Sequence, residues 1–302
     1  MAQSRPLARV VHRANHGLQT RDDRMKGIIR VRRALDVLRR EGPASFVRKA
    51  SRIVSDRLLA HGPAEHLIVL ESFRPHEPGM TMVDVGAATG NTLAAFVEAG
   101  WQVHAFEPDP ANRAVLERIF GTIGSVRIDR RALSSRPANR TSFYTSAQSP
   151  GISSLVPFHD SHRQTEEVPV TTLANYLEEA GLDRIDFLKV DTEGSDLRVL
   201  QGHNWQLIQP KVVMCEFDDR KTASLGTKWP ELAAFLQSAG YRVLVSEWQP
   251  LANYGSGHRW QAYQRFPCEL ADPAGWGNLI GVLDPAQMDR IERSFQQHAR
   301  RK

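Results

Sequence analysis

Two acidic residues, Glu107 and Asp191, each follow a short apolar run, and acids in such places can bind hydroxyl groups or move protons. Glu107 comes 17 residues after Gly90, directly after the run Gln102–Phe106. An acid about 20 residues after a glycine turn, at the end of the next strand, accepts hydrogen bonds from ribose hydroxyls. We therefore expect a ligand that contains a nucleoside, with Glu107 and the following Pro108 in its binding site.

The loop from Gly86 to Gly90 narrows the choice of nucleoside ligand. A dinucleotide-binding loop reads G-x-G-x-x-G, and its middle glycine admits a pyrophosphate, but the middle position here is Ala88. A phosphate-binding loop needs Gly-Lys-Ser or Gly-Lys-Thr, which is absent. Glycines let the backbone approach a ligand where a β-carbon would clash. A nucleoside site without phosphate-binding residues fits S-adenosylmethionine, and we expect Ala87 and Asn91 to contribute to it.

A second group of candidate residues consists of three acids. Asp191 and Glu193 follow the apolar run 187–190, and Glu216 follows the run 211–215. Ligands of open α/β sheets bind beyond the carboxyl ends of the strands, so these acids should lie beside the nucleoside site. We expect them to be catalytic, with Asp191 as the general base or acceptor-orienting acid. Helix capping would explain one of the acids, and the trio could also hold Mg²⁺ through oxygen ligands; the sequence leaves metal dependence open.

A parallel sheet is needed to bring these residues together. Short apolar runs bounded by glycine are typical of buried parallel strands. Runs of this kind occur at 82–85, 102–106, 126–129, 187–190, 211–215, 241–245 and 277–282. Helices are expected at 91–98, 111–120, 171–178, 195–202, 231–240 and 285–302, a further strand at 141–145 and an extended segment at 168–170. The alternation of strands and helices predicts an α/β fold with a mostly parallel sheet.

The basic charge of the chain is concentrated at its start. Residues 1–60 hold 15 Lys or Arg and 5 Asp or Glu, whereas the remaining residues hold 24 and 29. Apolar residues recur at helical spacing in 28–38 and 46–58. We expect residues 1–60 to be a basic helical extension, poorly ordered in its first 24 residues, that caps a main domain of residues 61–302. The alternative is contact of these helices with an anionic membrane surface or with nucleic acid.

Composition indicates an ordinary globular protein, with 41% hydrophobic and 24% charged residues. No apolar run is long enough to span a membrane, and the N-terminus lacks the apolar segment of a secretory signal. The cysteines Cys215 and Cys268 form no CxxC pair. We expect a cytoplasmic protein.

Residues 246–276 are rich in aromatic side chains and include His258. They are expected either to line an acceptor pocket, with His258 reaching into it, or to pack as an insertion. The sequence favours neither interpretation.

Five segments, in this order, resemble FkbM-type methyltransferases: VDVGAATGN from Val83, FEP from Phe106, GISSL from Gly151, VTTL from Val170 and FLKVDTEGSDLRVLQG from Phe187. The resemblance covers about residues 82–217 and implies a Rossmann-like class I methyltransferase fold with seven strands, the last of them antiparallel. Asp84 stands at the usual acidic position of the first motif, and Ala132 and Leu133 stand where adenine contacts usually sit. Between the two acids the family usually carries an apolar residue, and this chain has Thr192.

The resemblance implies transfer of a methyl group from S-adenosylmethionine to a hydroxyl of a glycan, a lipid-linked sugar or a natural product. We expect a small-molecule or glycan acceptor and no nucleic acid, with peripheral membrane contact by the N-terminal helices left open. The alternative is a degenerate methyltransferase fold that docks on membrane or nucleic acid through its basic arm. The intact loop glycines, Glu107 and Asp191 argue against degeneracy, and Ala88 disfavours an NAD-dependent oxidoreductase.

Overall fold

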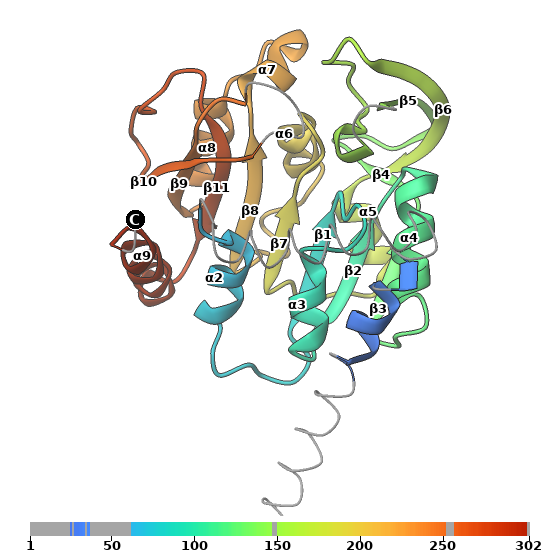
Figure 1. Ribbon diagram of the computed structural model, residues 1–302, viewed down its shortest axis with the longest axis horizontal. Coiled ribbons are helices and arrows are strands. Elements are labelled where there is room, and N and C mark those ends of the chain that lie inside the picture. The colour runs from blue at the N-terminus through green and yellow to red at the C-terminus, as the bar shows by residue number, and fades with distance from the viewer. Residues whose placement is uncertain are drawn as a thin grey trace, which may run out of the picture.

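Eight strands form the main sheet within the part of the chain that the computed structural model describes, residues 25, 27–33, 35–36, 62–146, 150–251 and 257–300. The strand order is β10-β9-β11-β8-β7-β1-β2-β3 (Figure 1). The strands are β1 Thr81–Val85, β2 Gln102–Phe106, β3 Val126–Asp129, β7 Phe187–Val190, β8 Val212–Phe217, β9 Arg242–Trp248, β10 Trp260–Arg265 and β11 Trp276–Val282. The predicted α/β class is confirmed.

The directions of the strands follow the prediction in the centre of the sheet and depart from it at one edge. Strands β3, β2, β1, β7 and β8 are parallel to one another. Strand β11 is antiparallel to both β8 and β9, which confirms the antiparallel last strand. The prediction of seven strands was wrong by one, because β10 adds an antiparallel edge beside β9. Its residues belong to the aromatic segment 246–276, where Trp260 is buried in the core instead of lining a surface pocket.

The order of the strands creates a crevice between β1 and β7. The chain builds β1, β2 and β3 outward on one side and then returns to the other side of β1 to form β7. Such a reversal is the topological switch point at which ligands of open α/β sheets bind. Val85 and Val190, the last residues of the two strands, are paired. The residues that follow them are therefore neighbours, although they lie more than 100 positions apart in the sequence.

A second, smaller sheet has the order β4-β6-β5 and stands at the upper right in Figure 1. It consists of β4 Ala132–Leu133, β5 Ala138–Ser146 and β6 His162–Thr171. The strand predicted at 141–145 and the extended segment at 168–170 are both present and longer than predicted. Buried apolar side chains hold this sheet together: Ala132, Phe143, Val168 and Val170.

Helices cover both faces of the main sheet (Figure 1). They are α2 Glu65–Ser72, α3 Leu93–Glu98, α4 Pro110–Phe120, α5 Leu173–Ala180, α6 Asp196–Gln201, α7 Asp219–Thr222, α8 Trp229–Ser238 and α9 Pro285–Ala299, with short 3-10 turns at Pro150–Ile152 and Ala223–Leu225. Successive side chains of a strand point to opposite faces, and β1 follows this rule. Met82 packs in the core that α2, α3, α4 and α9 cover, whereas Val83 packs in the core under α5, α6 and α8.

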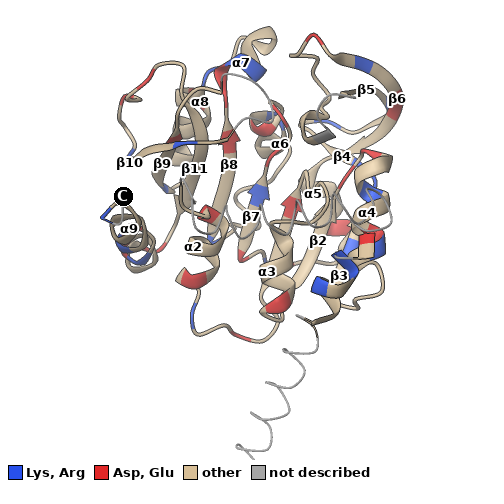
Figure 2. Ribbon diagram, in the orientation of Figure 1, with Lys and Arg blue, Asp and Glu red and all other residues tan. Residues whose placement is uncertain are grey.

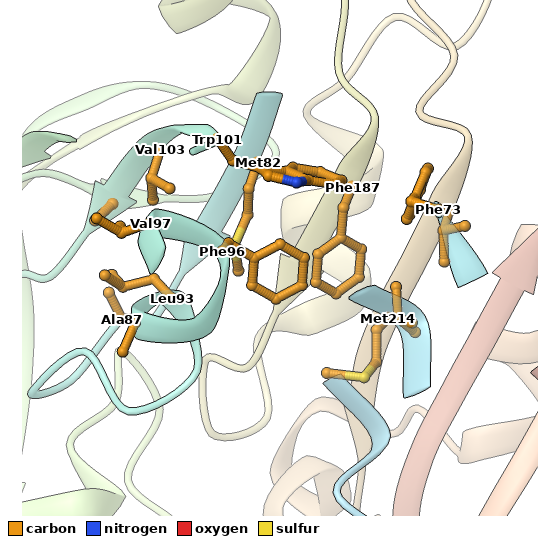
Figure 3. Packing of buried hydrophobic residues seen from close by; sticks show 14 of the residues in the cluster. Phe73, Met82, Ala87, Leu93, Phe96, Val97, Trp101, Val103, Phe187 and Met214 are labelled. Atoms are coloured by element: carbon orange, nitrogen blue, oxygen red, sulfur yellow. The ribbon is translucent and has the colours of Figure 1, made fainter. Parts of the chain in front are cut away.

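Aromatic side chains pack helix α3 against the main sheet (Figure 3). Phe96 of α3 stacks on Phe187 of β7 with ring centroids 5.1 Å apart. The Trp101 ring meets Phe96 and Phe73 edge-on, each at 5.1 Å. Aromatic pairs in these geometries add about 0.5–1.5 kcal/mol each to the free energy that their burial supplies. This packing fixes the helix that follows the glycine loop at the end of β1.

The described residues of the N-terminal extension, 25, 27–33 and 35–36, are helical and pack on α4. Ile29 is buried, and Arg32 donates hydrogen bonds to the carbonyl of Ile119 and to the hydroxyl of Thr122. Asp36 forms an ion pair with Arg118 at 2.8 Å. These contacts favour the helical cap over a free arm.

The predicted helix at 46–58 and the expectation for the first 24 residues lie outside the described residues. Within the described part, no helix has both the length and the apolar character needed to cross a membrane.

Candidate active site

The loop after β1 brings the backbone of the first motif against the end of β7. Gly86 has a φ of 78°, and a β-carbon there would lie 1.9 Å from the carbonyl oxygen of Asp191. Gly90 has a φ of 83°, and its β-carbon would meet the Phe120 ring at 2.4 Å. Only glycine satisfies both the positive φ and the close approach. The two glycines therefore set the floor of the crevice between β1 and β7.

Glu107, which follows β2, holds this loop in place through hydrogen bonds to the backbone. One of its carboxylate oxygens accepts the Ala88 N–H at 2.6 Å, and the other accepts the Asp109 N–H at 2.8 Å. Burial raises the pKa of Glu107 to about 7, although these two hydrogen bonds favour the charged form. Each carboxylate oxygen has a second lone pair. Glu107 can thus hold the loop and still accept hydroxyl groups of a ligand.

A pocket of about 620 Å³ opens above the loop. The lining residues are Val85, Gly86, Ala88, Phe106, Glu107, Pro108, Asn112, Arg131, Ala132, Leu133, Phe143, Gly151, Ser153, Ser154, Leu155, Asp191, Thr192 and Glu193. The pocket joins the nucleoside-binding candidates of β1 and β2 to the acids of β7, as the strand order requires.

One end of the pocket is apolar and suits a flat ring. Its walls come from the end of β2, from β4 and from the small sheet: Phe106, Pro108, Ala132, Leu133, Phe143 and Leu155. Ala132 and Leu133 were predicted to contact adenine, and they lie here. Sequence reasoning missed Phe143, because its strand reaches the pocket only through the second sheet.

The hydroxyl-rich loop of the small sheet forms a further wall. The Ser153 hydroxyl donates to the Asp109 carboxylate at 2.8 Å, and the Ser154 hydroxyl donates to the carbonyl of Glu193 at 2.8 Å. The loop thereby connects the α4 N-terminus, where Asp109 is the N-cap, with the end of β7. The composition of GISSL was visible in the sequence, but its partners were not.

Two residues in this pocket have strained backbones. Ala88 has a φ of 47° and Glu193 a φ of 58°, and they are the non-glycine residues with positive φ in the described part of the chain. Such conformations cost on the order of 1–3 kcal/mol and are found mainly at functional sites. Both residues line the same pocket, which identifies it as the main candidate site.

A buried lysine links the acids of β1 and β7. The Lys189 ammonium lies 3.3 Å from Asp84, 3.3 Å from Asp191 and 3.4 Å from the carbonyl oxygen of Gly86. Burial alone would lower the pKa of Lys189, but the charges of Asp191 and Asp84 outweigh it and raise this pKa. Asp84 is fully buried, and desolvation raises its pKa against the opposing charge of Lys189. Asp84 therefore lies beneath the pocket and not on its surface.

A second buried lysine, Lys221 of α7, links the remaining acids. Its ammonium lies 2.6 Å from Glu193 and 2.5 Å from Glu216. Burial raises the pKa of Glu193 to about 7, although Lys221 opposes this, and burial also raises the pKa of Glu216 well above its usual value. Burial would lower the pKa of Lys221, but Glu216 and Glu193 raise it instead. Both acids are therefore held by an internal cation.

The three predicted catalytic acids do come together. One carboxylate oxygen from each of Asp191, Glu193 and Glu216 lies within 4.8 Å of the others. Figure 2 shows the alternation of charge across the strands, with a basic position on β7 between acidic positions on β1 and β8. Sequence reasoning predicted the acids and missed Lys221, because the pairing depends on the turn of α7 toward β7.

The other predicted cofactor residues lie below or beside the pocket. Ala87, Gly90 and Asn91 belong to the loop under it and are absent from its lining. Ala87 donates its N–H to the carbonyl of Phe106, which fixes the loop to β2. Glu216 lines a neighbouring pocket of about 350 Å³ instead.

The aromatic segment 246–276 is largely a packed insertion in its described residues. Trp276 donates its indole N–H to the carbonyl of Gln249, and Trp248 donates to Glu65 of α2. His258 is exposed and meets the Trp276 ring edge-on at 5.0 Å. Packing accounts for these side chains without an acceptor pocket.

The FkbM methyltransferase domain family matches residues 84–243, more than half of the 302 residues, and the chain belongs to this family. The family is one of methyltransferases, and it implies S-adenosylmethionine as the cofactor. The residues present fit this cofactor: the pocket has an apolar end for adenine, Glu107 at the ribose position and an anionic end that suits a sulfonium.

Similarity to individual proteins is more limited. Methyltransferase sdnD of Sordaria araneosa is 36% identical over 75 residues, which cover 23% of this chain and 26% of the relative. The chain thus matches about a quarter of the length of that relative. A precorrin-6Y C5,15-methyltransferase from Geobacter metallireducens superposes with a TM-score of 0.37 at 11% identity, over 72% of this chain and 86% of that one. The METTL16 methyltransferase domain gives a TM-score of 0.40 at 11% identity, over 72% and 66% of the two chains.

Proposed function

We propose that this methyltransferase acts on a hydroxyl oxygen of a glycan, a lipid-linked sugar or a small natural product. The observation that carries this proposal is the accessibility of the Asp191 side chain in the pocket. Its side chain is 36% exposed, whereas those of Glu193 and Glu216 are 15% and 10% exposed. Asp191 is thus the acid of the cluster that an acceptor meets first.

The charge of the site supports a neutral acceptor. Asp191 and Glu193 line this end of the pocket, whereas Asp84, Asp196 and Glu216 do not, and the Lys189 and Lys221 ammonium groups lie among these acids. The carboxylates that face the pocket repel phosphate groups and attract the positive charge of a sulfonium. This balance favours a sugar or alcohol hydroxyl over a nucleic acid as the acceptor.

Asp191 serves as the general base and as the group that orients the acceptor. When bound, the cofactor supplies an electrophilic methyl group on a positively charged sulfur. The Asp191 carboxylate accepts a hydrogen bond from the acceptor hydroxyl and holds its oxygen in line with the methyl group. A carboxylate is too weak a base to ionise an alcohol beforehand. It takes the proton as the carbon–oxygen bond forms.

The other residues of the site bind the cofactor and position the catalytic carboxylate. Glu107 accepts the ribose hydroxyls, the apolar walls enclose adenine, and Lys189 fixes the Asp191 carboxylate from behind. Glu193 lines the acidic end, and Glu216 is linked to Glu193 through Lys221 from the neighbouring pocket. The places of Glu107 and Asp191 around one pocket support these assignments.

A panel of acceptors tests the proposal. Methyl transfer from radiolabelled S-adenosylmethionine would be measured with simple glycosides, polyols, amines and thiols, and the labelled product identified by NMR. We expect O-methyl products, whereas N-, S- or C-methyl products would refute the proposal. Binding of S-adenosylmethionine without transfer to any acceptor would favour the degenerate binding module.

Asp191→Asn tests the role of the base on the acceptor that the panel yields. The substitution keeps the shape of the side chain and removes its charge. We expect turnover to fall by ~10²–10⁴, as for a positioned acid–base group, and cofactor affinity by calorimetry to stay within a few-fold of wild type. Full turnover in this variant would remove Asp191 from the mechanism.

A further inference from the structure

Lys221 occupies the place that a metal ion would take among the acids of the site. The oxygens of Asp191, Glu193 and Glu216 are close enough together to ligate one divalent cation. The Lys221 ammonium, however, already lies 2.6 Å from Glu193 and 2.5 Å from Glu216. Its side chain is 4% exposed, so it has no route to solvent as an alternative.

The backbone holds Lys221 in this place. Asp218 is the N-cap of α7 and accepts the Arg220 N–H at 3.0 Å, which starts the helix directly after β8. A β-carbon at Gly194 would lie 2.9 Å from the Lys221 carbonyl oxygen. The absence of that carbon lets the α7 backbone pack against the turn that carries Glu193. Both partners of the ion pair are thus fixed before any ligand binds.

Displacing this lysine is electrostatically costly. A metal ion that bound Glu193 and Glu216 would leave the Lys221 ammonium buried without an anionic partner, and an unpaired buried charge is strongly unfavourable. The ring of Phe158, 5.9 Å from the ammonium, offers only a weak attraction in exchange. The ammonium therefore excludes a divalent cation as long as it is present.

We propose that Lys221 is the built-in cation of this acidic cluster: it positions Glu193 and Glu216 for methyl transfer, and it makes a divalent metal unnecessary. A neutral side chain of similar length at position 221 then turns the same three acids into a divalent metal site. The part of the proposal that concerns turnover rests on the proposed function; the part that concerns metal binding does not.

The test measures Mn²⁺ binding by calorimetry and by electron paramagnetic resonance in wild type, Lys221→Met and Lys221→Met/Glu193→Gln. We expect no site-bound Mn²⁺ in wild type, one Mn²⁺ per chain in Lys221→Met with a rise in melting temperature on its addition, and at least tenfold weaker binding in the double variant. Lys211→Met is the matched control. The Lys211 ammonium lies 2.8 Å from the Asp186 carboxylate, and this ion pair is outside the pocket. It should bind no Mn²⁺.

Turnover gives the second readout once an acceptor is known. Wild-type turnover should be unchanged by EDTA, and Lys221→Arg should retain more turnover than Lys221→Met. Mn²⁺ bound to wild type and lost in Glu193→Gln, or turnover abolished by EDTA, would overturn the proposal. So would a folded Lys221→Met chain that binds no Mn²⁺. If Lys221→Met does not fold, the wild-type measurements decide, because metal-free wild type with EDTA-insensitive turnover supports the proposal. Failure to find any acceptor leaves the Mn²⁺ result standing on its own.

Discussion

Cofactor affinity should weaken in mild acid because of one buried carboxylate. Glu107 is 4% exposed, and burial raises its pKa to about 7 in the protein without ligand. The charged form is the one that accepts the ribose hydroxyls, so binding keeps Glu107 ionised. Below pH 7 the group is protonated, and binding must first release this proton. The experiment therefore changes the pH from 8 to 6 and compares the loss of cofactor affinity in wild type and in Glu107→Gln.

The magnitude follows from the raised pKa. For a group that binds the ligand only when ionised, the apparent Kd scales with 1 + 10^(pKa − pH). With a pKa of about 7 this factor is about 1.1 at pH 8 and about 11 at pH 6, so affinity should fall about tenfold. The same group in water, with a pKa of about 4.3, would change affinity by only a few per cent in this range.

Calorimetry with S-adenosylhomocysteine at pH 6, 7 and 8 measures the effect. This product lacks the sulfonium, so the charge of Glu193, whose pKa is also about 7, weighs less on its binding. His66 and His104, with pKa lowered by burial to about 4, do not titrate in this range. Glu107→Gln should bind more weakly at pH 8 and show no slope, whereas Glu193→Gln should keep the slope. Equal slopes in wild type and Glu107→Gln would refute the reasoning.

Three further predictions concern the loop and the extension. Gly86→Ala should lower the free energy of unfolding far more than Gly100→Ala. Both glycines have positive φ, which costs ~1–2 kcal/mol for alanine, but of the two only Gly86 faces a backbone oxygen. Equal losses of stability in chemical denaturation would contradict the contact between the Gly86 loop and the end of β7. Arg33→Ala should lower stability by ~1.5 kcal/mol and weaken cofactor binding, since Arg33 donates to the Gly90 carbonyl at 2.6 Å; the exposed Arg30→Ala is its control and should change neither. Deletion of residues 1–24 should leave melting temperature and cofactor affinity nearly unchanged, and a large loss of either would mean that they belong to the core.

The parts of the fold that could be predicted are those encoded locally. The runs that became β2 and β7 are mostly apolar, although His104 and Lys189 are buried within them, and the acids Glu107 and Asp191 directly after them are placed by the strand ends alone. Because carboxyl ends of parallel strands meet at one edge, Glu107 and Asp191 could be brought to one pocket from their positions in the sequence.

The parts that could not be predicted depend on pairing across the chain. Lys221 looks like an ordinary surface lysine in the sequence, and only the fold turns it toward Glu193. The strand β10 has the aromatic composition of a pocket wall, yet Trp260 is buried against α9, where its ring stacks near Phe295 at 6.1 Å. Composition does not encode which surface will cover a side chain.

The contacts of the N-terminal helix join parts of the chain that are distant in sequence. Arg33 reaches Gly90 across 57 positions, and Arg32 reaches Ile119 and Thr122 across 87 and 90. The same short helix therefore rests on α4 through Arg32 and braces the cofactor loop through Arg33. A ligand that binds the braced loop adds RT ln(1 + [L]/Kd) to its stability, about 2.7 kcal/mol at a hundredfold excess over Kd. Bound cofactor should therefore stabilise the packing of the helix at residues 27–33 on α4 and the cofactor loop. Hydrogen exchange in residues 27–33 should slow when cofactor is bound.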